Sequence, residues 1–88
     1  MTWDEVAARL QKTSRKGQDT PRTLRLTRVR YNAAKDLPQF EAAAIYFDVR
    51  RATLKGLLPQ RYQVIAYKDG CWWSTRLEEE DVEALLEK

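Results

Sequence analysis

The stretch that most constrains the fold is Arg61 to Leu77, with the sequence RYQVIAYKDGCWWSTRL. It contains two short runs rich in β-branched and aromatic residues on either side of Lys68-Asp69-Gly70. Glycine after aspartate is typical of a tight turn, because glycine tolerates the positive φ that such turns require. The stretch therefore predicts a β-hairpin, and we expect this hairpin to be the centre of the sheet on which the other elements pack.

Side chains alternate between the two faces of a strand, which divides the second strand of the hairpin into two sets. The more apolar set should face the helices: Cys71, Trp73, Thr75 and Leu77. The other set should face away from them: Trp72, Ser74 and Arg76. We therefore expect one of the adjacent tryptophans to be buried and the other to be exposed. Two turns fit the sequence: a two-residue type I′ turn at Asp69-Gly70, and a three-residue type I turn with a glycine bulge at Lys68-Asp69-Gly70.

The length of 88 residues predicts one small domain spanning residues 1–88. The single cysteine excludes an intramolecular disulfide, on which small secreted domains usually depend. The N-terminus has acidic residues where a signal peptide would be basic, and no apolar run reaches the ~18–20 residues of a membrane span. We expect a cytoplasmic protein that does not enter a membrane.

Helical patterns lie at both ends of the chain. Residues 2–13 begin with the capping-box pair Thr2 and Glu5, followed by an apolar stripe with helical spacing. Residues 78–88 place Val82 and Leu85 on one stripe behind an acidic first turn. The chain is thus basic at its front, with nine Lys/Arg against three Asp/Glu in residues 1–35, and acidic at its tail, with six acids against one lysine in residues 77–88.

Residues 23–31 alternate as a strand does, but the apolar phase slips between the leucines at 24 and 26 and the later pair Val29 and Tyr31. A β-bulge near Thr27-Arg28 would return all four to one face. Three arginines would then project to the opposite face: Arg25, Arg28 and Arg30.

Residues 38–55 carry mixed signals. Glu41 and the three alanines after it favour a helix, whereas Ile45 to Val49 has high β propensity. We predict a strand over 40–50 and a loop or single helical turn over 51–58. The order is then α-β-β-β-β-α, which is an α+β fold with an antiparallel sheet and both helices on one face. The alternatives are a small barrel with flanking helices, and a third helix over residues 38–55.

Catalytic chemistry has little support in the sequence. The chain has no histidine and one cysteine, which removes the usual general base and the ligand clusters that zinc requires. We therefore expect no enzyme, no metal and no cofactor. The exception to be considered is a histidine-free nuclease that stabilises its transition state by charge alone.

Binding is the better-supported activity. Basic and aromatic side chains would share the helix-free face of the sheet, where arginine pairs with phosphate and aromatic rings stack on bases. The sequence predicts these contact residues: Arg22, Arg25, Arg28, Arg30, Tyr46, Arg50, Trp72 and Arg76. The leading hypothesis is a small nucleic-acid-binding protein. The alternative is a protein–protein interaction module, acting as an inhibitor, an adaptor or a subunit of an assembly, with a homodimer through a sheet edge as one form.

Overall fold

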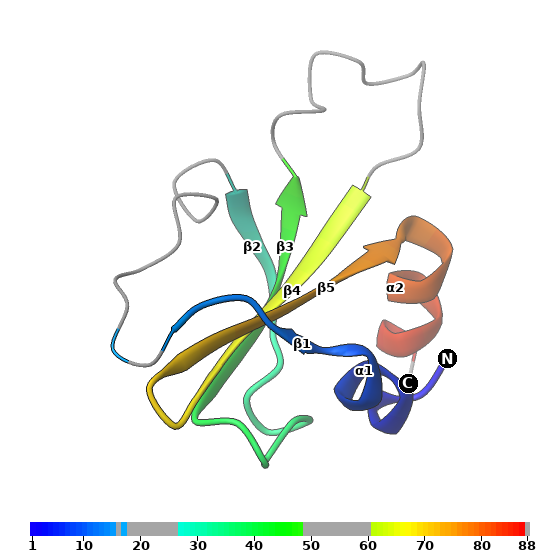
Figure 1. Ribbon diagram of the computed structural model, residues 1–88. Helices are drawn as coiled ribbons and strands as arrows, with labels where there is room; N and C mark the ends of the chain where they lie inside the picture. Colours follow the sequence, from blue (N-terminus) through cyan, green and yellow to red (C-terminus); the bar gives the residue numbers. More distant parts are fainter. Residues whose placement is uncertain (16, 18–26, 49–60, 88) are drawn as a thin grey trace.

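Figure 1 shows the computed structural model of the protein, in which residues 1–15, 17, 27–48 and 61–87 are described. Five antiparallel strands form one open sheet, with a helix at each end of the chain. The elements are α1 (Trp3–Arg9), β1 (Gln11–Lys12), β2 (Thr27–Asn32), β3 (Ala42–Asp48), β4 (Arg61–Lys68), β5 (Cys71–Glu78) and α2 (Glu79–Leu86). This confirms the predicted α+β class, with one more short strand than expected. Because the sheet is open, the barrel alternative is wrong.

The hairpin lies at the middle of the sheet, as predicted, since the strand order is β1-β5-β4-β3-β2. Strands β4 and β5 pair from Arg61 opposite Glu78 to Lys68 opposite Cys71. The turn between them has two residues, and φ is +53° at Asp69 and +78° at Gly70. Positive φ at both central positions is the requirement of a type I′ turn, whose twist matches that of the flanking strands.

Helix α1 starts where the sequence predicts but ends earlier. The Thr2 side chain accepts a hydrogen bond from the Glu5 backbone N–H at 3.3 Å, which satisfies one free donor of the first turn. The helix ends at Arg9, and Leu10 already has extended backbone angles. The predicted helix over 2–13 is therefore too long. Residues Gln11–Lys12 instead form β1, because pairing with β5 satisfies their backbone groups.

Within the stretch 38–55, for which both helix and strand were considered, Ala42–Asp48 form strand β3. It pairs with β4 on one side and with β2 on the other. Ala43 and Ile45 are buried while Ala42 is exposed, which is the period of a strand. The third-helix alternative is wrong over 42–48. The loop or helical turn expected over 51–58 lies outside the described residues.

Both helices cover the same face of the sheet, as predicted, and they lie beside one another in Figure 1. Val6 and Leu10 reach the core from the front of the chain, and Val82 and Leu85 from its tail. The strands contribute Ala43, Ile45, Tyr62, Val64, Ala66 and Leu77.

The segment between β2 and β3, expected to be only a turn, also packs into this core. Ala33 and Leu37 are almost completely buried, and Phe40 is buried too. The backbone N–H of Leu37 donates to the carbonyl of Ala33, and that of Phe40 donates to the carbonyl of Leu37. These hydrogen bonds form two consecutive turns that keep the segment compact. The segment thus covers one end of the apolar core.

Candidate functional site

The strand register defines the face that neither helix covers, which we call the open face. Residues directly opposite one another in neighbouring strands share a face. One cross-strand row of the open face is Val29, Tyr46, Gln63 and Arg76. The next row is Asn32, Ala44, Ile65, Ser74 and Gln11. The third row is Ala42, Tyr67 and Trp72.

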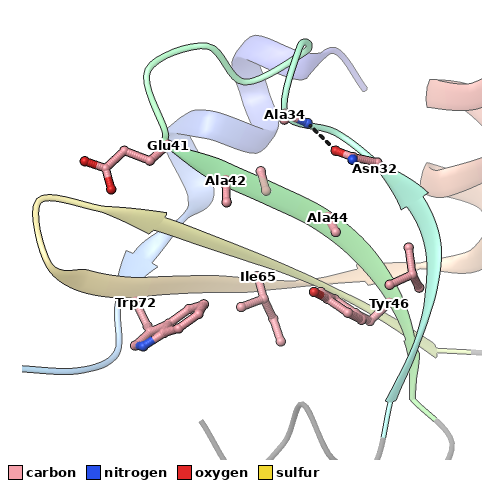
Figure 2. A pocket seen from close by; sticks show the side chains of 10 residues that line it. Asn32, Ala34, Glu41, Ala42, Ala44, Tyr46, Ile65 and Trp72 are labelled. Atoms are coloured by element: carbon pink, nitrogen blue, oxygen red, sulfur yellow. Dashed lines mark hydrogen bonds between the residues drawn. The ribbon is translucent and has the colours of Figure 1, made fainter. Parts of the chain in front are cut away.

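A hollow of about 490 Å³ lies on this face, with Trp72 near one end and Tyr46 near the other (Figure 2). Figure 2 shows the side chains of Trp72, Ile65 and Tyr46 following one another along it, on the same side of the strands. Ala42 and Ala44 line it as well, and their short side chains leave the space open. Among the described residues that line the hollow, Glu41 alone carries a charge.

Trp72 is held in place through its backbone. Its N–H donates to the Ser14 hydroxyl at 2.8 Å, and its carbonyl accepts from the Thr13 N–H at 2.8 Å. Its ring packs edge-on against Tyr67, with 4.9 Å between the ring centroids. The chain after β1 therefore fixes the strand position from which the Trp72 side chain extends along the open face.

Tyr46 extends from β3, and partial burial raises the pKa of its phenol. The phenol is consequently neutral at physiological pH and keeps its O–H donor. Its neighbour across the β2 edge is Val29, which is 59% exposed. An exposed valine beside a tyrosine makes this end of the hollow apolar and accessible.

Trp73 lies on the helix-covered face, as predicted, but both tryptophans are only half-buried. The Trp73 ring packs edge-on against Phe40 at 5.8 Å, and the Lys68 ammonium group lies 5.9 Å from its centroid. The two tryptophans therefore lie on the predicted faces, but the expected difference in their exposure is wrong. Among the described residues, neither indole nitrogen has a hydrogen-bond partner, although both nitrogens are buried.

The bulge in β2 is real but lies further along the strand than predicted. The register shifts between Val29 and Tyr31, so Arg30 is the extra residue. Tyr31 then lies opposite Ile45 on the helix side, whereas Val29 lies on the open face. The prediction that Val29 and Tyr31 share a face is wrong, because the slip occurs between them.

The predicted basic face is divided by the same shift. Arg76 is exposed on the open face, in the row of Tyr46. Arg28 is exposed too, but it lies opposite Phe47 and so belongs to the helix-covered side, which corrects its predicted placement. Arg30 is exposed at the bulge on the sheet edge. The other predicted contact residues, Arg22, Arg25 and Arg50, lie outside the described residues.

Four residues that line the hollow were not among the contact residues predicted from the sequence: Val29, Ala42, Ala44 and Ile65. The alternation of β3 does place Ala42 and Ala44 on the side of Tyr46. Ile65 is 4% exposed although it faces away from the helices. Its position could have been noticed in the sequence, because it is an apolar residue on a strand face that was expected to be polar.

In the part of the chain that the structure describes, no three acidic, cysteine or histidine side chains gather as a metal site would require. No described helix has the length and apolar character needed to cross a bilayer. No family model matches the chain, and no curated protein or solved structure matches it either.

Proposed function

We propose that this is a non-catalytic binding protein that contacts nucleic acid through the open face and the adjoining edge strand β2. The observation that carries the proposal is the row in which Tyr46 and Arg76 share a face that neither helix covers, with Trp72 on the same face. Stacking of a base on an aromatic ring contributes roughly 1–3 kcal/mol, and arginine pairs with phosphate through two parallel hydrogen bonds.

The distribution of charge supports an approach from the β2 side. Strand β2, with Arg28 and Arg30, forms one edge of the sheet. The acidic helix α2 instead contacts β5 and β4 on the helix-covered face. A polyanion is attracted to the basic edge and repelled by α2.

Fluorescence anisotropy with a labelled oligonucleotide at increasing salt tests the proposal. Each phosphate contact should lower log K by about 0.7–0.9 per unit of log salt. Arg76→Glu should weaken binding at least tenfold and reduce this slope. Lys12→Glu is the matched control, because Lys12 lies opposite Trp73 on the other side of the sheet and should change affinity little. Absence of oligonucleotide binding at low salt would falsify the proposal.

A second candidate, contact with a partner protein, is favoured by one observation: the 59% exposed Val29 beside a hollow whose lining is mostly apolar. Aromatic and apolar side chains of this kind form the centres of protein interfaces. The bulge and the two arginines of β2 oppose strand addition at that edge, so the partner would use the open face. A salt-insensitive dimer that Val29→Lys dissociates, with no oligonucleotide binding, would place this candidate first.

A further inference from the structure

We infer that the hollow between Tyr46 and Trp72 receives unpaired bases, so that the protein selects single-stranded over double-stranded nucleic acid. The inference rests on the proposed function and specifies the form of its ligand. It is carried by the spacing of the two rings, by the two alanines between them and by the position of the charges.

The spacing of the rings requires an extended strand. Tyr46 and Trp72 lie two strands apart and four residues apart along the sheet, because Gln63 and Tyr67 of β4 are their respective neighbours. From the rise per residue along a strand and the spacing between neighbouring strands, their backbone positions are roughly 17 Å apart. Stacked bases of one strand are about 3.4 Å apart. The two rings therefore contact different bases of an extended run of several nucleotides.

The floor of the hollow suits the flat face of a base. Strands favour β-branched and aromatic residues, so Ala42 and Ala44 on one face leave a space that larger residues would fill. Ile65 lies between the two aromatic side chains in Figure 2 and supports them from below, but it is only 4% exposed. The accessible apolar surface of the hollow comes from the two rings, Ala42 and Val29. An apolar surface of this kind gains free energy by covering a base but not by covering a phosphate, whose desolvation is costly.

The charged side chains Glu41 and Arg76 favour bases inside the hollow and phosphate groups outside it. Glu41 at the rim repels phosphate from the hollow, whereas Arg76 lies in the row of Tyr46 but outside the lining. Bases therefore enter the hollow while the phosphates pass over Arg76. A duplex presents its phosphates outward and keeps its bases stacked, so it cannot use the hollow without unpairing.

The test compares one labelled mixed-sequence single strand with the same strand annealed to its complement, at low salt. The wild-type protein should bind the single strand at least tenfold more tightly. Ala44→Leu fills the hollow without changing charge, and it should weaken single-strand binding at least tenfold while leaving the salt slope unchanged. Ala84→Leu is the matched control, because Ala84 is exposed on α2, on the helix-covered side of the sheet, and it should have no effect.

Two results overturn the inference while leaving the proposed function standing: equal affinity for single strand and duplex, or wild-type affinity in Ala44→Leu. If neither oligonucleotide binds, the proposed function fails and the inference falls with it. Thermal unfolding establishes that each variant is folded. Should Ala44→Leu be unfolded, Tyr46→Leu removes a stacking ring while keeping apolar volume, and it must then show the same loss for the inference to hold.

Discussion

Leu37 should contribute as much to stability as a residue in a strand, although it lies in the connection between β2 and β3. Its side chain is 1% exposed and belongs to the core that both helices and the sheet share. Truncation of a fully buried leucine to alanine costs about 2–5 kcal/mol, and we expect about 3 kcal/mol for Leu37→Ala. A chain of this length has a total stability of only ~4–13 kcal/mol, so the loss is a large fraction of it.

Urea unfolding followed by tryptophan fluorescence measures this change. With a slope of about 1.5 kcal/mol/M, a loss of 3 kcal/mol lowers the unfolding midpoint by about 2 M. The control is Gln39→Ala, an exposed position in the same connection, which should stay within about 0.5 kcal/mol of the wild type. A midpoint shift below about 0.5 M for Leu37→Ala would refute the conclusion that this connection closes the core.

Three further perturbations test other parts of the structure. Gly70→Ala should destabilise by roughly 1–2 kcal/mol in chemical denaturation, because an L-residue is strained at positive φ; an unchanged midpoint would contradict the type I′ turn. Trp73→Ala should cost about 2–3 kcal/mol, less than the 3–5 of a fully buried aromatic, since the ring is half-buried; complete unfolding would mean that it is a central core residue. The pKa of Tyr31 is raised, mainly because its hydroxyl donates a hydrogen bond to the Asp36 carboxylate at 2.7 Å. Burial and the negative charge of Asp36 raise it further. This stabilisation is present below the unfolded-state value of about 10 and is lost as pH rises through the higher folded-state value. Stability measured between pH 8 and 11 should therefore fall less steeply in Tyr31→Phe than in the wild type, with a remaining slope from Tyr46; identical slopes would argue against the hydrogen bond.

The site was partly predictable from the sequence. Tyr46, Trp72 and Arg76 were placed on the same side of the sheet from alternation alone, and the register agrees. Arg28 was misplaced because alternation cannot locate an extra residue within a strand. The hollow was missed because it arises from residues that are short, and the effect of a short residue depends on which neighbours surround it in the fold.

The features that the sequence by itself determined are local. The hairpin turn follows from Asp69 and Gly70, since positive φ at two successive positions is a requirement that few residue types meet. The Thr2 cap and the two faces of β5 likewise depend on neighbours a few residues away. Tertiary structure decided the rest: the pairing of β1 with β5, the position of the bulge at Arg30 and the burial of Leu37. These depend on contacts between distant segments, where satisfying backbone groups and covering apolar surface outweigh local propensity.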